Sequence, residues 1–403
     1  MTNSTSNSVD TSTRETIDEF RARVIAFHKS VPDLLTGIDD PLERGKTYRR
    51  ALCDARLAAV SYPIELGGAD LPAEYEAAGR EAALDLLPGE DSMFTLGVGM
   101  AVPTLREYGT PALQQRFIPA ALRGDEVWCQ LYSEPGAGSD LAGLTTRAER
   151  DGDEWIITGQ KVWTSQAQHS DMAILLARTD ADLPKHRGIT MFALPMNQPG
   201  VTVRPLVQMT GVAEFNEVFL DEARVPADWV IGDVNGGWAL AVALLGHERT
   251  SLGRGVTTDD AAKSKAGRSP LPFDGLVARA TAMGRLNDPV VRQQLAVAYT
   301  GEQLVPWGTQ RGLHPSIGKL WRTLQGRHAA QLAHELGGAT AAAWEASDTD
   351  ADYWAYHVLN CRGMSLGGGT DEIQRKTLGE RVLGLPREPG PDRNTPFRDL
   401  PAN

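Results

Sequence analysis

The stretch at residues 130–140 reads QLYSEPGAGSD, and no other part of the 403-residue chain is as informative. Three small residues, Gly136, Ala137 and Gly138, stand there between hydroxyl-bearing side chains. Backbone N–H groups of such a loop can approach a ligand closely, which suits an anionic or heteroaromatic cofactor. A Gly-rich loop alone is more often a surface turn, and neither a strand–GxGxxG–helix unit nor a GxxxxGKS/T loop surrounds this one. Whether this loop binds a cofactor or is a surface turn depends on the motifs elsewhere in the chain.

Upstream of this loop the sequence pattern is helical. Ser12 and Glu15 have the spacing of a capping box. Apolar residues then recur at helical period, at Ile17, Phe20, Val24 and Phe27. Helix breaks are expected at Pro63 with Gly67 and Gly68, and at residues 109–111. We therefore predict an all-helical domain over residues 13–125, after a disordered polar leader over residues 1–12 with no features of a signal peptide.

The pattern changes near Val127. Short runs of β-branched and apolar residues bounded by Gly or Pro predict strands at 154–158, 173–177, 189–194 and 218–220. Helical period returns at 238–253, 292–311, 316–336 and 371–383. These patterns predict a middle β sandwich or barrel over residues 126–235, a C-terminal helical region over 236–388 and a tail over 389–403. Residues 255–275 lack an apolar period and are expected to form a loop, either functional or disordered.

Composition narrows the class of protein. Apolar residues make up 41% and charged residues 23%, which is ordinary globular usage, and no apolar run reaches the length of a membrane span. The net charge of -12, without a Lys/Arg cluster, argues against a nucleic-acid partner. The three cysteines and eight histidines show neither disulfide nor metal-ligand spacing. We expect a cytoplasmic protein with no metal site and no membrane or nucleic-acid partner.

Two further segments carry a family resemblance. Residues 159–165 read GQKVWTS, and residues 369–375 read GTDEIQR. Together with the loop at 130–140 they resemble the acyl-CoA dehydrogenase family, in unbroken order over residues 15–388. The resemblance implies a mainly α fold with a central β domain: an N-terminal helical domain, a middle β sandwich or barrel and a C-terminal four-helix bundle. FAD would lie between the β domain and the bundle.

The resemblance also implies cofactor contacts. Tyr132 and Ser133 would contact the flavin ring, and Trp163 and Ser165 would pack on its isoalloxazine edge. Ser139 would face the cofactor or the CoA moiety. The full set of implied FAD contacts is Leu131, Tyr132, Ser133, Gly138, Ser139, Trp163, Thr164, Ser165, Gln294, His334, Gly337, Gly338, Thr370 and Glu372. Arg249 would join Ser139 on the CoA side.

The resemblance implies a catalytic base at a different position from the family's commonest one. That position is a Glu directly before Gly-Thr, where this chain has Gly368. A subset resembling isovaleryl-CoA and long-chain dehydrogenases places the Glu on an earlier helix, where this chain has Glu248. The base must reach the α-proton of the thioester on the face opposite the flavin, and the missing side chain at Gly368 leaves volume for Glu248. The Gly368 N–H and the flavin ribitol would polarise the carbonyl. A helix-surface carboxylate paired with Arg249 or another cation is the alternative interpretation of Glu248.

Other positions depart from the family pattern. The family's Arg-x-x-Phe-Gly element is missing, and residues 284–289, GRLNDP, stand near its place; Gln294 still matches the following Gln. The family's Gln-x-x-Gly-Gly begins with His334 in this chain. Gly337 and Gly338 can still admit the pyrophosphate, but the side-chain contact has changed.

The resemblance implies FAD-dependent α,β-dehydrogenation of an acyl-CoA thioester to the trans-2-enoyl-CoA, within fatty-acid or lipid catabolism. It also implies a homo-tetramer or homo-dimer and an electron-transfer flavoprotein as acceptor. Two alternatives stay open. One is a flavin monooxygenase or oxidase on the same fold, and the other is a weakly catalytic partner subunit of a heteromeric acyl-CoA dehydrogenase. The sequence does not identify the acyl group.

Overall fold

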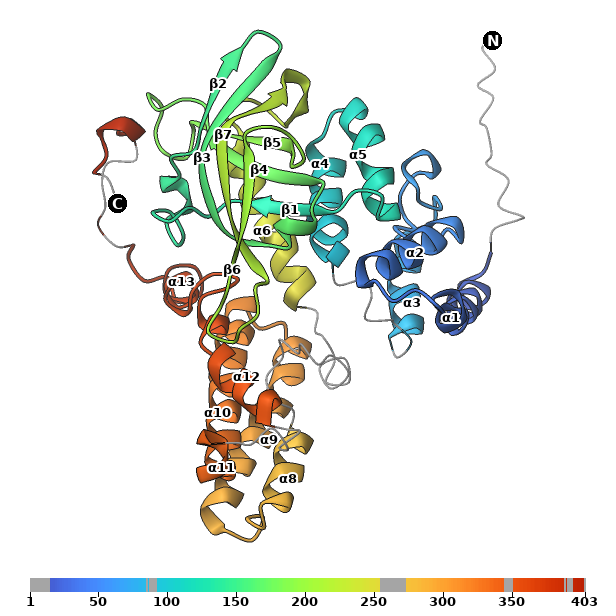
Figure 1. The fold of residues 1–403 in the computed structure, drawn as a ribbon, viewed down its shortest axis with the longest axis vertical. Coiled ribbons are helices and arrows are strands. Elements are labelled where there is room, and N and C mark those ends of the chain that lie inside the picture. The colour runs from blue at the N-terminus through green and yellow to red at the C-terminus, as the bar shows by residue number, and fades with distance from the viewer. Residues whose placement is uncertain are drawn as a thin grey trace, which may run out of the picture. The chain divides into compact units, whose positions relative to one another are not determined.

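The computed structural model describes residues 15–84, 86, 93–253, 273–343, 351–387, 389 and 394–401 (Figure 1). It divides into two compact units. One unit takes its described residues from 1–95 and 114–126, and the other from 96–113 and 127–403. The domain boundaries predicted from the sequence remain a prediction.

The first unit is helical, as expected. Its helices are α1 (Ile17–Leu34), α2 (Pro41–Asp54), α3 (Glu74–Ala83) and most of α5 (Pro111–Arg123), with a short 3-10 turn η1 (Ile64–Leu66). Helix α1 packs on α3, where the rings of Phe20 and Tyr75 meet edge to face with centroids 5.2 Å apart. The predicted breaks are confirmed, because α4 (Val102–Tyr108), in the second unit, ends just before Gly109 and η1 ends at Gly67 with φ +91°.

The predicted capping box at Ser12 and Glu15 does not start α1, and Ser12 itself lies outside the described residues. The N-cap of α1 is Thr16, whose hydroxyl accepts from the Glu19 N–H at 3.3 Å while the Glu19 carboxylate accepts from the Thr16 N–H at 2.8 Å. Glu15 instead pairs with Arg23 at 2.8 Å. Both pairs have the same spacing in the sequence. Thr16 caps the helix because it directly precedes Ile17, the first helical residue, which places Glu19 at the third helical position.

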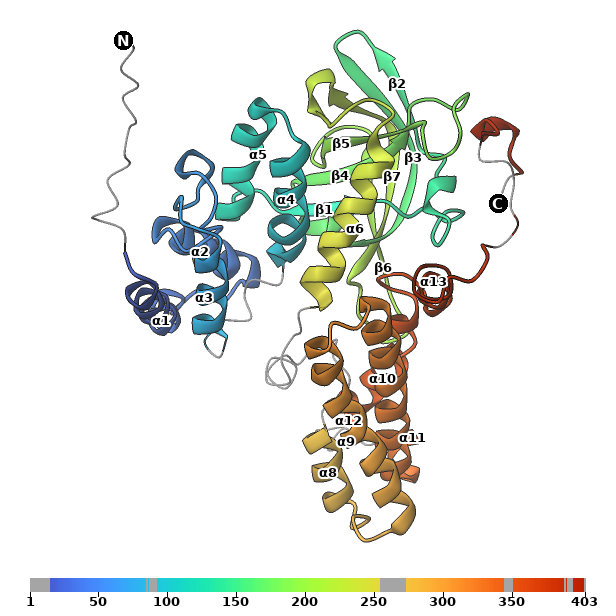
Figure 2. The same ribbon diagram turned by 180° about the vertical axis from the view of Figure 1, so that it is seen from behind.

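The second unit contains a twisted eight-stranded sheet in the order β6-β7-β3-β2-β4-β5-β8, with β1 parallel to β4. Its strands are β1 (Trp128–Leu131), β2 (Arg147–Asp151), β3 (Glu154–Ser165), β4 (Met172–Arg178), β5 (Ile189–Pro195), β6 (Val201–Leu206), β7 (Phe215–Pro226) and β8 (Val230–Ile231). Every residue of β4 is buried, which explains its continuous apolar run. Helix α6 (Gly237–Gly253) lies across the sheet and contacts β5 (Figure 2).

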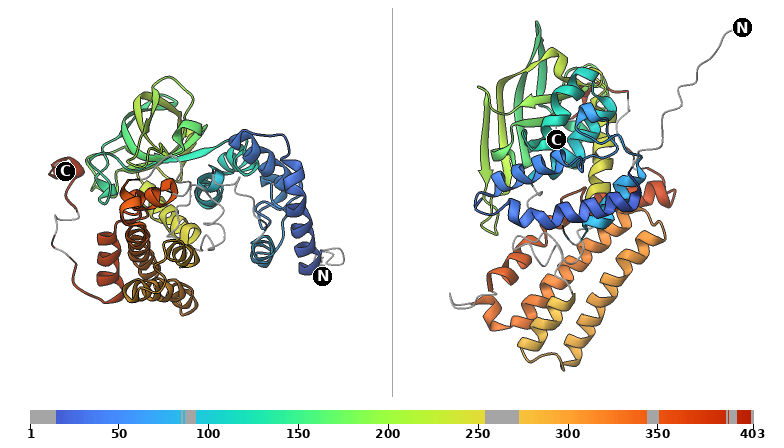
Figure 3. Two further views of the ribbon diagram at one scale, coloured as in Figure 1. Left: turned by 60° about the horizontal axis from the view of Figure 1, so that its bottom comes forward. Right: turned by 90° about the vertical axis from the view of Figure 1, so that its right-hand side faces the viewer.

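Helices follow the sheet in the same unit. They are α8 (Phe273–Ala282), α9 (Pro289–Gln310), α10 (Pro315–Gly337), α11 (Ala339–Ala342), α12 (Ala351–Asn360) and α13 (Asp371–Thr377). Helices α8, α9, α10 and α12 pack together (Figure 3) around a core that includes Leu276, Leu295, Leu332 and Leu336. Short 3-10 and π segments are η3 (Gly97–Ala101), η4 (Leu141–Gly143), η5 (Ala167–His169), η6 (Ala227–Trp229), η7 (Gly363–Ser365), η8 (Leu378–Val382) and η9 (Phe397–Asp399).

The predicted loop at 255–275 is tested only at its end. Residues 255–272 lie outside the described residues, whereas Phe273, Asp274 and Gly275 begin helix α8, so the loop prediction is wrong for these three. The Phe273 N–H donates to Glu302 at 2.9 Å and its ring contacts Tyr299, which holds the start of α8 against α9. The predicted order of helices, strands and helices is confirmed. None of the helices in the described part of the chain is long and apolar enough to cross a membrane.

Candidate functional site

A bulge in strand β3 exposes a tryptophan. The register between β3 and β7 shifts between Lys161 and Thr164, and Trp163 lies there with φ +61°. Its side chain is 60% exposed, between neighbours that are buried, and its ring meets the edge of Phe215 at 5.9 Å. A bulky residue in the left-handed region costs on the order of 1 kcal/mol or more, so the surrounding structure must hold it there.

Two hydrogen bonds join the β3 bulge to the Gly-rich loop. The Val162 N–H donates to the Ser133 carbonyl at 2.9 Å. The Lys161 ammonium donates to the Tyr132 carbonyl at 3.1 Å. The segments 130–140 and 159–165, which the sequence separates by 18 intervening residues, therefore form one continuous surface element.

A buried ion pair lies beneath this element. Lys161 Nζ is 2.9 Å from Glu134 Oε1, and both side chains are almost fully buried. The Glu134 carboxylate also accepts from the Thr145 N–H at 2.7 Å and the Thr146 N–H at 2.9 Å. Burial would raise the pKa of Glu134, but the charge of Lys161 and these hydrogen bonds lower it to about 2. Both residues stand inside the quoted motifs, yet the sequence analysis assigned them no role.

The serines predicted to contact the cofactor have hydroxyl groups without a hydrogen-bond partner among the described residues. Within the described part of the chain, the hydroxyls of Ser133, Ser139 and Ser165 make no hydrogen bond. Ser139 is exposed, while Ser133 and Ser165 are half-buried. The charged groups behind them, Glu134 and Lys161, are already paired with each other, whereas these hydroxyls and the exposed Trp163 ring are available to a ligand. This arrangement fits a planar cofactor with polar edges.

The other residues of this loop and of β3 that are predicted to contact FAD differ in exposure. Leu131 is fully buried in the sheet core, so it can reach a ligand only through its main chain. Tyr132 and Thr164 are also buried, whereas Gly138 is exposed. The Thr164 carbonyl accepts from Asn216 Nδ2 at 3.0 Å, which ties the strand after the bulge to β7.

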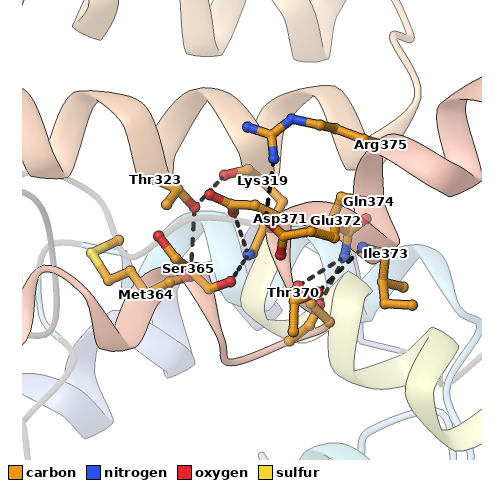
Figure 4. A network of polar contacts seen from close by, with 12 residues as sticks. Lys319, Thr323, Met364, Ser365, Thr370, Asp371, Glu372, Ile373, Gln374 and Arg375 are labelled. Atoms are coloured by element: carbon orange, nitrogen blue, oxygen red, sulfur yellow. Dashed lines mark hydrogen bonds and ion pairs between the residues drawn. The ribbon is translucent and has the colours of Figure 1, made fainter. Parts of the chain in front are cut away.

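The C-terminal motif forms a glycine turn held by a polar network (Figure 4). Thr370 is the N-cap of α13, and its hydroxyl accepts from the Ile373 N–H at 3.2 Å. Gln374 Nε2 donates to the Gly368 carbonyl at 2.8 Å, which closes the turn. Gly368 and Gly369 have φ +64° and +82°, a region that glycine adopts without strain.

Asp371 anchors this turn to helix α10. Its carboxylate is 3.0 Å from Lys319 Nζ and 3.8 Å from Arg327 Nη2. Burial would raise the pKa of Asp371, but hydrogen bonding and charge from Lys319 lower it. The turn is therefore fixed from α10, while the predicted contact Glu372 is exposed, with only a weak 3.5 Å interaction with Arg375.

Open space and an unpaired donor occur together at Gly368 among the described residues. A Cβ built there would have no heavy atom within 4 Å among the described residues. Its N–H makes no backbone hydrogen bond within the described part of the chain. Both the space and the donor are therefore available to a ligand.

The predicted pyrophosphate glycines lie at the end of α10. A Cβ on Gly337 would lie 2.4 Å from Arg279 Nη2, because the buried Arg279 side chain packs on this glycine and donates to the Ala333 carbonyl at 2.7 Å. Gly338, with φ +55°, is exposed and open. His334 is exposed as well. The Gln294 carbonyl accepts from His328 Nε2 at 3.1 Å when that nitrogen carries the proton. Arg279 is a residue that the sequence analysis did not single out.

Glu248 and Arg249 lie on helix α6. The side chains of this part of α6 are outside the described residues, so the proposed base and its distance from Gly368 stay predictions. No group of three or more His, Cys, Asp and Glu side chains that could hold a metal occurs among the described residues.

Comparisons with known proteins identify the family of the chain. The family model described as "Acyl-CoA dehydrogenase, N-terminal domain" matches residues 12–125, and "Acyl-CoA dehydrogenase, middle domain" matches 129–223. "Acyl-CoA dehydrogenase IpdE1" of Mycobacterium tuberculosis is 37% identical, over 92% of this chain and 98% of that protein. "Acyl-CoA dehydrogenase FadE34" of the same organism is 39% identical over 84% of this chain, which spans 46% of that longer protein.

Solved structures give the same result. The "Tcur3481-Tcur3483 steroid ACAD" structure is 27% identical with a TM-score of 0.70, covering 93% of this chain and 99% of that one. A chain of the ChsE4-ChsE5 complex from Mycobacterium tuberculosis is 26% identical with a TM-score of 0.70, covering 94% of this chain and 100% of that one. The chain therefore belongs to the acyl-CoA dehydrogenase family of flavin-dependent oxidoreductases.

Proposed function

We propose that this chain binds FAD and removes one hydrogen each from the α and β carbons of an acyl-CoA thioester, giving the trans-2-enoyl-CoA. The observation that carries the proposal is the joined element of residues 130–140 and 159–165. It presents an exposed Trp163 ring and uncommitted Ser133 and Ser165 hydroxyls on a buried scaffold held by the Glu134–Lys161 ion pair. When bound, FAD would supply the acceptor for the hydride from the β carbon.

The chain would hold the cofactor at three places. Trp163 and Ser165 would contact the ring edge, and Ser133 would donate to the ring from the opposite segment. Thr370 lies at the start of α13, where its hydroxyl already accepts a hydrogen bond, and the main chain of this turn would face the cofactor. Gly338 is the more open of the two pyrophosphate glycines, since Arg279 covers Gly337.

The proton chemistry would use Glu248 and Gly368. Glu248 would take the α-proton, and the uncommitted Gly368 N–H would donate to the thioester oxygen as negative charge develops there. The open space at Gly368 supports this division of roles, because a carboxylate from another element can occupy it.

Assembly and substrate class are also part of the proposal. We take an electron-transfer flavoprotein as the acceptor and a homo-oligomer as the working form. Two similar structures, Tcur3481-Tcur3483 and ChsE4-ChsE5, are each named for a pair of proteins. The name of the first also contains the words "steroid ACAD". Steroid-derived acyl-CoAs therefore belong in the substrate panel beside straight and branched ones.

One observation favours the partner-subunit alternative. The Arg279 guanidinium packs on Gly337, where the resemblance places the pyrophosphate. A chain that leaves FAD binding to its partner could tolerate this contact.

The absorbance spectrum of the purified chain separates the two functions. The catalytic proposal expects about one flavin per chain and anaerobic bleaching by at least one acyl-CoA of the panel. A flavin-free chain that gains flavin only with a co-expressed partner would favour the partner-subunit function instead. Rapid oxygen consumption without an external acceptor would point to an oxidase.

A further inference from the structure

The C-terminal residues 394–401 pair with the loop between β4 and β5. The Phe397 N–H donates to the Leu183 carbonyl at 2.9 Å, and the Arg398 N–H donates to the Ala181 carbonyl at 3.1 Å. Pro396 and Pro184 form an isolated antiparallel bridge next to the Phe397–Leu183 hydrogen bond. Residues 396–399 are therefore attached to the β4–β5 loop by one bridge pair and a 3-10 turn.

The side chains of this segment contribute unequally. Arg398 pairs with Asp182 at 2.5 Å, but both side chains are mostly exposed and such pairs contribute little. The Phe397 ring lies against the guanidinium of Arg178, with Cζ 3.5 Å from the ring centroid. Arg178 is only 5% exposed, so this cation–π contact is largely desolvated. Phe397 is the main anchor of the segment.

Arg178 carries the contact onward to the turn that follows the Gly-rich loop. Its Nη2 donates to the Ala142 carbonyl at 2.7 Å and its Nε to the Leu144 carbonyl at 3.2 Å. Its Nη1 donates to the Lys185 carbonyl at 3.1 Å. Burial lowers the pKa of Arg178 to about 10, which still leaves it charged at neutral pH. One guanidinium thus holds both the β4–β5 loop and the turn at residues 141–144.

A second link runs through Lys185. Its ammonium lies 2.7 Å from one Asp140 oxygen and 2.8 Å from the other. Asp140 directly follows Ser139, which is predicted to contact the cofactor or CoA. Residues 140–144 are therefore held from one side by Arg178 and Lys185, and the next two residues are held by Glu134.

We propose that Phe397 is a positioning residue of the active site: it holds Arg178, and Arg178 holds the loop that presents Ser139 to the cofactor and CoA. The inference rests on the proposed function, because it assigns the loop a ligand. If the inference is correct, changes in residues 394–401 affect the binding of acyl-CoA more than the rate of turnover. In this role Phe397 would act through Arg178 and would touch neither substrate nor cofactor.

The test compares Phe397→Ala with Phe397→Tyr and Asp399→Ala in the full-length protein with FAD added. Tyr keeps the ring over Arg178. Asp399 lies in the same 3-10 turn, and among the described residues its side chain makes no hydrogen bond or ion pair with the loop. Amide hydrogen exchange reads the loop directly, because the Gly143 and Leu144 N–H groups are bonded within it at 2.9 and 3.1 Å. We expect Phe397→Ala to speed their exchange about tenfold, with strand β5 unchanged as an internal reference.

The kinetic readout is the split between KM and kcat. Phe397→Ala should raise KM for the best acyl-CoA at least about fivefold, with kcat within about twofold, and Phe397→Tyr and Asp399→Ala should match the wild type. Removing residues 394–403 should reproduce the alanine effect. Unchanged exchange at residues 143–144, or faster exchange with unchanged KM, would overturn the proposal. A wild-type protein that neither binds FAD nor oxidises any acyl-CoA would refute the proposed function. The positioning role of Phe397 would then be refuted as well.

Discussion

Lys161 in strand β3 and Glu134 in the Gly-rich loop form a buried ion pair, with Nζ 2.9 Å from Oε1, that joins the two segments predicted to carry the flavin. Every oxygen of the carboxylate has a partner, because Thr145 and Thr146 supply the remaining donors. The pair is therefore the scaffold of the site and not one of its reactive groups.

Removing one member of this pair should strongly lower the free energy of unfolding. Lys161→Met leaves the Glu134 charge buried without its counter-ion, and such changes cost about 3–5 kcal/mol. Denaturant unfolding of the variant measures the loss. The control is Glu154→Gln, which breaks the exposed pair with Arg224 at 2.6 Å and should change the free energy of unfolding by less than about 0.5 kcal/mol. Equal effects of the two variants would show that the buried pair has no special weight.

A buried histidine should make stability depend on pH in a defined window. Burial lowers the pKa of His357 from 6.5 to about 4, and its ring packs against Tyr353 at 4.6 Å. The unfolded chain therefore binds the proton more readily between these values, so the free energy of unfolding falls as pH drops from about 6.5 to about 4.

The variant His357→Phe removes the imidazole, so neither the folded nor the unfolded chain can bind a proton at this position. Its unfolding free energy should fall less than that of the wild type across this window, by on the order of 2 kcal/mol after solvent screening. The exposed His169→Gln serves as control and should follow the wild type. Glu134 acts in a separate window, because its lowered pKa gives stability that is lost only as pH falls from about 4.5 to about 2. Parallel wild-type and His357→Phe curves would contradict the assignment.

Regular elements were predictable because periodicity records which face is buried. Phe20 and Val24, placed on one face of α1 from the sequence, are both in the core of the first unit. The β3 bulge was not predictable, since nothing in the sequence around Trp163 announces a left-handed residue. The Glu134–Lys161 pair and the Phe397–Arg178 contact join residues far apart in the chain, and single-sequence spacing carries no signal for such contacts. The capping error arose because Ser12 and Thr16 offer the same motif.

The exposed Trp163 ring gives a direct test of cofactor binding. The double variant Trp163→Ala with Ser133→Ala removes one ring contact and one hydroxyl, which should weaken FAD binding by on the order of 2 kcal/mol or more. Titration of the flavin-free protein with FAD, followed by flavin fluorescence, measures the dissociation constant. Met209→Ala, at an apolar residue that is 74% exposed between β6 and β7, is the control and should bind like the wild type. An unchanged constant in the double variant would refute the assignment.

An apolar stripe on α9 should mediate assembly. Val290, Val297 and Leu304 are 65%, 48% and 40% exposed and follow one another at intervals of seven residues. This spacing places them along one line of the helix, as in coiled-coil packing. The double variant Val297→Glu with Leu304→Glu should dissociate the oligomer in sedimentation and lower its flavin content. The control Arg292→Glu changes an exposed charged residue of the same helix and should leave the mass unchanged. A wild-type chain that sediments as a fully flavin-loaded monomer would end the oligomer proposal.

The proposed base is tested by moving its carboxylate. Glu248→Gln removes the proton acceptor at nearly constant size, so FAD and acyl-CoA should still bind while anaerobic flavin reduction slows at least about 10²-fold. Glu248→Gly with Gly368→Glu returns the carboxylate to the family's commoner position, where a new Cβ meets no described atom within 4 Å. Recovery should be partial for two reasons. A side chain at φ +64° is strained, and a misplacement of about 1 Å can cost about 10²-fold in rate. Gly368→Ala in the wild-type background isolates the strain, because it adds a Cβ without a second carboxylate. If Glu248→Gln reduces its flavin at the wild-type rate with a verified substrate, then Glu248 is only a helix carboxylate and the base lies elsewhere.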